Sequence, residues 1–366
     1  MFKIHAVQAR FGDCLLLEAG GSPRHFVLID GGPPNTFADD LQPALKSIVG
    51  AGGKLDLVVL SHVDNDHVIG LLDMFADLQQ AQTDGTTPLV RAHRLWHNSF
   101  QKTIDPNGEI TQRLQTLTNV TGSAGVAMPM AVDAFLGIRE GYRLRTLAVQ
   151  LSLALNADFG DELITVEKAM HAIKIGSLSL RVVGPTAANL KELRGDWLAW
   201  LKKNEQKILQ EPKTAANADQ SVPNLSSIVL FAECANKTAL LTGDARGDHI
   251  EQGLAAANLS QNGKLHVNLL KLQHHGSNRN ITAAFLERIT ADTYLISADG
   301  TYGNPDFETL KWIVQAATKR HQQIEIVVTN STPSTKKLLK QFAPAKHNYK
   351  LRVLVPNRHS IEIELA

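Results

Sequence analysis

The chain has 366 residues, of which 43% are hydrophobic and 20% are charged, and its formal net charge is +1. This composition is typical of a globular protein with a sizeable core, and it excludes a disordered chain, which combines low hydrophobicity with high net charge. The balanced charge also argues against a dedicated nucleic-acid-binding protein with a long footprint, because such proteins usually carry a clear basic excess.

The cysteines and the N-terminal segment favour the cytoplasm. Cys14 and Cys234 are the two cysteines, and neither belongs to a CxxC pair, so we expect buried thiols rather than a disulfide framework. The first residues include several charged side chains and lack the apolar stretch of a signal peptide. No window approaches about 18 uninterrupted apolar residues, so no membrane span is predicted.

The first 60 residues predict short strands around one helix. The pattern predicts strands at 2–8, 14–18, 25–29 and 55–60, and a helix at 43–49. The strand at 55–60, LDLVVL, is a continuous apolar run of the length expected for a strand buried on both faces.

The middle of the chain changes character. Residues 100–172 are interpreted as a mostly helical insertion, with helical composition over 131–157. A strand is predicted at 173–183, followed by a helix at 189–210 with apolar residues near 3.6-residue spacing. Residues 211–224 are polar and contain proline, which favours a loop. The helix and loop over 186–223 are expected either to cover an active site or to pack into the core.

The second half repeats the alternation of strands and helices. Strands are predicted at 227–232, 237–241, 267–272, 293–297, 324–329, 351–356 and 361–365. Helices are predicted at 247–257, 282–289, 306–318 and 334–341. Recurrence in both halves predicts a single α/β domain over 1–366, a sandwich of two similar halves with sheets inside and helices outside.

The strongest chemical signal is the polar segment directly after the strand at 55–60. His62, Asp64, Asp66 and His67 offer four metal-binding side chains in a short stretch. A loop at a strand end can turn successive side chains toward one point. The arrangement suits two metal ions about 3.5–4 Å apart, as in two-metal hydrolases. The competing interpretation, a polar loop with helix-capping aspartates, suits one such residue better than four.

This segment resembles the HxHxDH signature of the metallo-β-lactamase superfamily, with Asp64 in place of the second histidine. The Asp-containing form is similar to the hydrolase domain of ComEC-type DNA-uptake proteins and to the choline-phosphate esterase branch. Five further segments resemble ComEC-type motifs: Phe11–Cys14 (FGDC), Asn224–Ser227 (NLSS), Leu240–Ala245 (LLTGDA), His274–Ser277 (HHGS) and Tyr302–Pro305 (YGNP). The resemblance covers about residues 1–100 and 173–310, and it implies a four-layer αββα sandwich.

The resemblance also implies a set of metal ligands. His62 and Asp64 would bind the first ion, Asp66 and His67 the second, and Asp244 would bridge the two. A carboxylate suits bridging because each of its oxygens can bind a different ion. The cofactors implied are two divalent ions, zinc or manganese and also iron, because Asp64 makes the first site richer in oxygen.

Two ligand assignments have alternatives, and one further residue is expected to position a ligand. His275 is preferred over His274 as the next ligand of the second ion, which leaves His274 as a candidate general acid. His97 is preferred over His93 as the remaining ligand of the first ion. Asp30, which matches the first aspartate of the superfamily, would hold a ligand histidine in one tautomer.

The substrate-binding candidates are Ser277, Arg279, Tyr302 and Asn304. Arg279 is the candidate phosphate clamp because its fork matches phosphate oxygens. Asn304 stands where the family's YGHP motif has a histidine, and an amide cannot transfer a proton.

The resemblance implies hydrolysis of a phosphate ester or phosphodiester, with nuclease activity included, through hydroxide formed from a metal-bound water and with Asp66 and His274 in the catalytic set. The expected substrates are a phosphorylated small molecule or a nucleic acid. Acyl hydrolysis of a lactone, thioester or lactam is the alternative enzyme class, and a non-catalytic binding module is the alternative outside catalysis.

Overall fold

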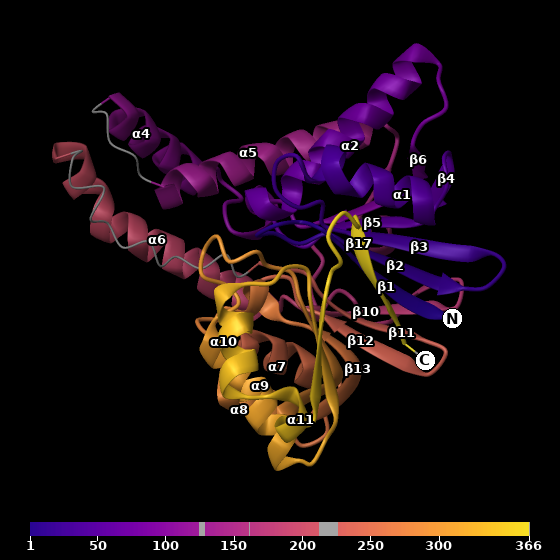
Figure 1. Cartoon of the computed structure of the whole chain (residues 1–366). Coiled ribbons are helices and arrows are strands. Elements are labelled where there is room, and N and C mark those ends of the chain that lie inside the picture. Colours follow the sequence, from indigo (N-terminus) through magenta and orange to yellow (C-terminus); the bar gives the residue numbers. More distant parts are fainter. Residues whose placement is uncertain (124–128, 161, 212–225, 366) are drawn as a thin grey trace.

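The computed structural model describes residues 1–123, 129–160, 162–211 and 226–365, and it contains two large mixed sheets flanked by helices (Figure 1). The first sheet has the strand order β17-β1-β2-β3-β5-β7-β8. Its strands are β1 (Phe2–Val7), β2 (Leu15–Gly20), β3 (Arg24–Ile29), β5 (Leu57–Leu60), β7 (Arg94–His97), β8 (Ala154–Leu155) and β17 (Ser360–Glu364). Strand β17 pairs with β1 at one edge of this sheet, so segments that are far apart in the sequence lie side by side.

The second sheet has the order β16-β15-β14-β13-β12-β11-β10-β9. Its strands are β9 (Ile173–Ile175), β10 (Leu178–Gly184), β11 (Val229–Cys234), β12 (Lys237–Leu241), β13 (Leu265–Lys271), β14 (Ile289–Ile296), β15 (Ile324–Val328) and β16 (Tyr349–Val353). A small third sheet pairs β4 (Gly53–Leu55) with β6 (Val90–Ala92).

Two groups of helices flank the two large sheets. They are α1 (Gln42–Ile48), α2 (Asn65–Asp84), α3 (Phe100–Thr103), α4 (Glu109–Ser123), α5 (Pro129–Gln150), α6 (Ala187–Gln210), α7 (Gly247–Ala256), α8 (Ala283–Arg288), α9 (Phe307–Lys319), α10 (Pro333–Gln341) and α11 (Pro344–His347). Helices α1, α2 and α5 share an apolar core with the first sheet, and α7 to α10 share another with the second. A third core joins side chains of both sheets, such as Leu17 and Leu230.

The structure corrects parts of the predicted element pattern. Helix α2 was not predicted, although its buried Val68, Leu71, Leu72 and Phe75 follow helical spacing. The helix predicted from the composition of 131–157 extends too far, because α5 ends at Gln150 and β8 follows. The strand predicted at 173–183 is a hairpin of two strands. The predicted loop at 211–224 lies outside the described residues from 212 onward.

The apolar stripe of α6 is core. Trp197 and Trp200 are each 5% exposed and lie in one cluster with Phe100 and with Leu114 and Leu117 of α4. The side chains therefore pack α6 against α3 and α4.

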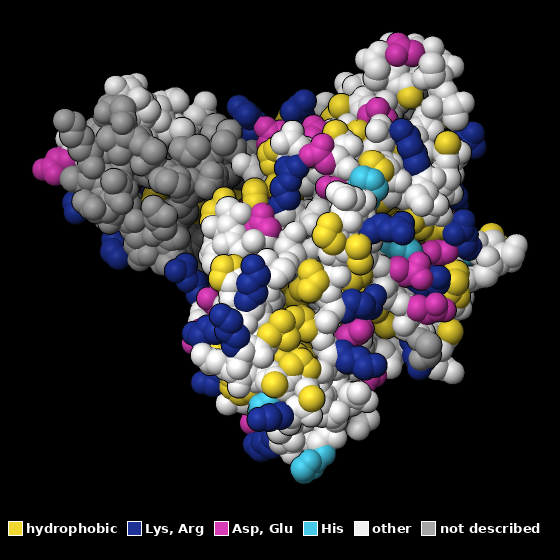
Figure 2. All heavy atoms as spheres, in the orientation of Figure 1, with side chains coloured by type: hydrophobic (Ala, Val, Ile, Leu, Met, Phe, Trp, Pro, Cys, Tyr) yellow, Lys and Arg dark blue, Asp and Glu magenta, His cyan; other side chains and the backbone are white. Residues whose placement is uncertain are grey.

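Figure 2 shows one face of the molecule with Lys and Arg side chains interspersed among acidic ones. In the described part of the chain, no helix is both long enough and apolar enough to cross a membrane.

Candidate metal centre

The chemically active side chains lie where strands of the two large sheets end. Asp30 follows β3, His62 follows β5, Asp244 follows β12, and His275 follows β13. The pairs β3–β5 and β12–β13 are parallel, so the carboxyl ends within each pair meet at the same edge. The first turn of α2 adds Asp66 and His67.

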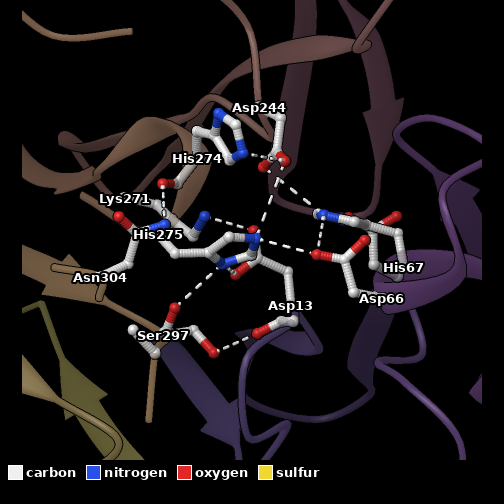
Figure 3. A network of polar contacts seen from close by, with 12 residues as sticks. Asp13, Asp66, His67, Asp244, Lys271, His274, His275, Ser297 and Asn304 are labelled. Carbon is white, nitrogen blue, oxygen red and sulfur yellow. Dashed lines mark hydrogen bonds and ion pairs between the residues drawn. The ribbon is translucent and has the colours of Figure 1, made fainter. Parts of the chain in front are cut away.

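Four of the predicted ligands form one compact group. Asp66, His67, Asp244 and His275 each offer a nitrogen or oxygen, and these atoms lie within 4.8 Å of one another (Figure 3). His67 Nε2 lies 3.6 Å from Asp66 Oδ2 and 3.5 Å from Asp244 Oδ1. His275 Nε2 lies 3.1 Å from Asp66 Oδ2 and 3.7 Å from Asp244 Oδ2. Two imidazoles and two carboxylates thus converge from three segments that are distant in the sequence.

Asp30 fixes the orientation of two histidines. Its Oδ2 accepts hydrogen bonds from His67 Nδ1 at 2.9 Å and from Ser61 Oγ at 2.7 Å, and its Oδ1 accepts from the Ser61 backbone at 2.7 Å. The His67 proton must then lie on Nδ1, which leaves a lone pair on Nε2. Because Ser61 Oγ donates to Asp30, it can accept from His62 Nδ1, which lies 3.0 Å away. Asp30 therefore directs both Nε2 atoms toward the site, the first one directly and the second through Ser61.

His275 is oriented from the second sheet. Its Nδ1 donates to the carbonyl oxygen of Ser297 at 3.0 Å, so the lone pair of the neutral ring lies on Nε2, on the side of Asp66 and Asp244. His274 and His275 adopt left-handed backbone conformations, with φ of 47° and 56°. This turn directs successive side chains to different sides, and it explains why one histidine is buried and the other is half-exposed.

His62 and Asp64 lie next to this group. His62 Nε2 is 3.5 Å from Asp64 Oδ2 and 3.7 Å from Asp244 Oδ2. Ser227 Oγ lies 3.2 Å from His62 Nδ1 and accepts the backbone N–H of Asp244 at 3.1 Å, so it ties the two sheets together here. Of the predicted NLSS motif, Asn224 and Leu225 lie outside the described residues.

The electrostatics of the group favour a cation. Burial alone would lower the pKa of His67 and His275, but the facing carboxylates outweigh it. The Asp244 charge raises the pKa of His67 well above its usual value and contributes most to raising that of His275 to about 10. Burial raises the pKa of Asp244, yet His67 and His275 hold it well below its usual range. Without a metal ion, protons are therefore retained on these rings to balance the carboxylates.

The same residues leave polar atoms unpartnered. The Nε2 atoms of His62 and His67 and the Oδ1 of Asp244 are buried without a hydrogen-bond partner. Buried polar atoms normally have one. Imidazole nitrogens and carboxylate oxygens are ligands for zinc, manganese and iron, so the donor set fits a divalent transition-metal ion.

Other predicted residues surround this group. His274 Nε2 lies 3.8 Å from Asp244 Oδ2, while its Nδ1 is 2.8 Å from Asn280 Oδ1. Asn304 Nδ2 donates to the His274 carbonyl at 3.4 Å. Ser277 is buried, and the ring of Tyr302, which is 74% exposed, packs edge-on against Phe11 with centroids 5.3 Å apart.

Three predicted residues lie outside the compact group of ligands: Arg279, His93 and His97. Arg279 is exposed at the same loop as Ser277. His93 is exposed between β6 and β7. His97 ends β7 directly beside β5 and is 2% exposed, yet it belongs to neither group of possible ligands found among the described residues.

Sequence reasoning assigned no role to Asp13 and Lys271. Asp13 belongs with Asp30 and His67 to a second group of possible ligands, and it forms a buried ion pair with Lys271. The sequence feature that could have revealed this ion pair is a lysine inside the apolar strand VNLLKL, since a buried lysine requires a partner.

Residues 7–81 match the family model of the metallo-beta-lactamase superfamily, which contains metal-dependent hydrolases. The match includes Asp30 and the segment from His62 to His67. No curated protein matches the chain.

Proposed function

We propose that the protein hydrolyses a phosphate ester or phosphodiester with the help of two divalent ions. The observation that carries this proposal is the position of Asp244. Its Oδ1 lies 3.5 Å from His67 Nε2, and its Oδ2 lies 3.7 Å from both His62 Nε2 and His275 Nε2. One carboxylate thus lies within 3.7 Å of ring nitrogens assigned to both ions, as a bridge between two ions requires.

The layer order supports the same family assignment for the whole chain. Three apolar cores lie between helices and first sheet, between the two sheets, and between second sheet and helices. We infer a four-layer αββα sandwich in one domain over 1–366, with residues 100–172 as an insertion into it.

The chain would hold the two ions through the predicted ligands. His62 and Asp64 would serve the first ion, Asp66, His67 and His275 the second, and Asp244 both. Bound divalent ions lower the pKa of a coordinated water and offset negative charge on phosphoryl oxygens. The oxygen-rich donor set suits manganese and iron as well as zinc.

The remaining residues have distinct roles in this proposal. His274 directs Nε2 toward Asp244 and stays half-exposed, so it is placed to exchange a proton with the substrate. The exposed guanidinium of Arg279 would bind a phosphoryl oxygen, with Ser277 and Tyr302 beside it. Asn304 would donate a hydrogen bond only.

The test combines metal analysis with turnover of a phosphodiester reporter. Asp66→Ala and Asp244→Ala should each lose bound metal and at least about a hundredfold in kcat/KM. Asp292→Ala is the matched control, because Asp292 pairs with His266 at 3.2 Å on the surface, outside the site. If the metal-loaded wild type turns over a lactone reporter and leaves phosphodiesters untouched, acyl hydrolysis replaces this proposal.

A further inference from the structure

A cavity of about 490 Å³ lies beside the loop that carries the first ligands. Its wall includes Val63, which stands between His62 and Asp64 in the chain, and His97 at the end of β7. Helices α4 and α5 form the rest of the wall together with residues around α3. The volume is in the range of small-molecule sites.

The lining of this cavity carries positive charge. Lys102, Arg139 and Arg145 all line it, and among the residues that the structure describes no Asp or Glu does. Glutamine, serine and threonine side chains supply neutral hydrogen-bonding groups, and Phe100 and Tyr142 supply aromatic surface. A cavity with this lining selects an anionic ligand with polar and apolar parts.

Arg145 is the side chain most available to such a ligand. Arg139 and Arg143 lie on the same helix, and both pair with Glu140, at 3.2 and 3.5 Å. Arg145 is half-buried, and no hydrogen bond or ion pair joins it to any residue within the described ranges. A guanidinium held in a cavity without a carboxylate partner is suited to phosphate, which it can bind through two N–H groups.

His97 adds a neutral group beside this charge. Both of its ring nitrogens are buried without a hydrogen-bond partner. Its backbone is held on both sides by Asn156, whose Oδ1 accepts from His97 N and whose Nδ2 donates to His97 O, each at 2.9 Å. Burial and the Arg145 charge lower the pKa of His97 to about 3, so the ring is uncharged at neutral pH. A cationic neighbour disfavours a metal ion at this ring.

Resting on the proposed phosphoester hydrolysis, we infer that this cavity binds a second anionic group of the substrate. Arg145 is the charged contact, and His97 is a neutral positioning residue in the wall of the cavity beside it. The substrate class is then a phosphodiester that carries a further phosphate, as oligonucleotides do. His97 belongs to this cavity and not to the metal ligands.

The test measures binding of inorganic pyrophosphate to the full chain by calorimetry, before and after removal of divalent ions. Removal of the metal excludes binding of the probe to the ions themselves, and the comparison with Arg145→Gln assigns the remaining binding to the cavity. Wild type should bind saturably, and Arg145→Gln should bind about tenfold or more weakly. Arg143→Gln, an exposed arginine on the same helix, should bind within about twofold of wild type. His97→Gln should weaken binding and retain the full metal content.

The result that overturns the inference is equal affinity in wild type and Arg145→Gln, or no saturable binding in wild type. Loss of metal in His97→Gln would return His97 to the ligand set and likewise contradict it. Arg145-dependent binding without any phosphodiester turnover would instead contradict the proposed hydrolysis and leave the cavity as an anion site. Two phosphodiester reporters that differ by one phosphate group extend the test, since Arg145→Gln should raise KM for the more charged one alone.

Discussion

Lys271 and Asp13 form an ion pair enclosed between the two sheets, with 1% and 2% of their side chains exposed. Asp13 Oδ1 lies 3.4 Å from His275 Nδ1 (Figure 3). The pair therefore contacts the ring nitrogen of His275 that is not proposed to bind a metal ion. Burial raises the pKa of Asp13, but the Lys271 charge, helped by His275, holds it below its usual value. The carboxylate therefore stays ionised and joins β13 to the loop before β2.

Lys271→Met should destabilise the protein strongly. The change leaves the Asp13 charge buried without its partner, which costs about 3–5 kcal/mol. The free energy of unfolding in urea, with EDTA present, measures the effect without a contribution from bound metal. The double variant Asp13→Asn, Lys271→Met should recover most of the loss, because it leaves no unpaired charge. A double variant as unstable as the single one would show that the lysine acts through packing alone.

Asp30→Asn should weaken metal binding without unfolding the protein. The amide cannot accept from His67 Nδ1, Ser61 Oγ and Ser61 N as a carboxylate does, so the histidines lose their fixed tautomers. Loss of such a partner typically costs 10–100-fold in metal affinity or activity, and we expect about that range by metal titration.

Asp56→Asn is the matched control for this variant. Asp56 is also a buried carboxylate, and it contacts His25 Nδ1 at 3.2 Å and accepts the Phe26 N–H at 3.1 Å, but it lies in neither group of possible ligands. The two variants should have similar stability without metal and differ in metal affinity. Equal metal affinities would remove Asp30 from the positioning role.

The segment from His62 to His67 shows how much of the site the local sequence pattern can predict. Four ligand-type residues after one apolar strand predicted a metal site, and the structure brings Asp66 and His67 together with Asp244 and His275. The helix that begins at Asn65 was missed, because the polar residues of its first turn read as loop.

His97 and Lys271 show what the sequence could not supply. A histidine after a short apolar strand has the same local pattern as a ligand, and only the packing of α5 places Arg145 beside it. Lys271 sits within an apolar run, and its partner Asp13 lies 258 residues away. Contacts between segments distant in the sequence decide both cases, and local propensity carries no information about them.

His97 should make the metal-free protein less stable in acid. In an unfolded chain a histidine titrates near pH 6.5, whereas burial and Arg145 lower the pKa of His97 in the folded state to about 3. As pH falls below about 6.5, the unfolded state binds a proton that the folded state does not. Stability is then lost at up to about 1.4 kcal/mol per pH unit until the folded pKa is reached.

The measurement compares wild type with His97→Gln in EDTA. Other groups titrate in both proteins, so the difference in slope belongs to His97. Between about pH 6.5 and 4.5, wild type should lose on the order of 2 kcal/mol more than the variant. Parallel pH profiles would mean that the imidazole is hydrated in the cavity and takes up a proton there as readily as in the unfolded chain.

Metal binding should release a proton from His275. With no metal, the Asp244 and Asp13 charges outweigh burial and raise the pKa of this ring to about 10, so near pH 8 both nitrogens carry protons. Nδ1 keeps its proton because it donates to the Ser297 carbonyl, and ligation at Nε2 requires the other to leave. Calorimetric titration with Mn²⁺ in two buffers of different ionisation enthalpy counts the protons released. His275→Gln should release about one proton fewer per chain than wild type, whereas His97→Gln should match wild type. An unchanged count in His275→Gln would place the metal away from Nε2 and would contradict the assignment of His275 to the second ion.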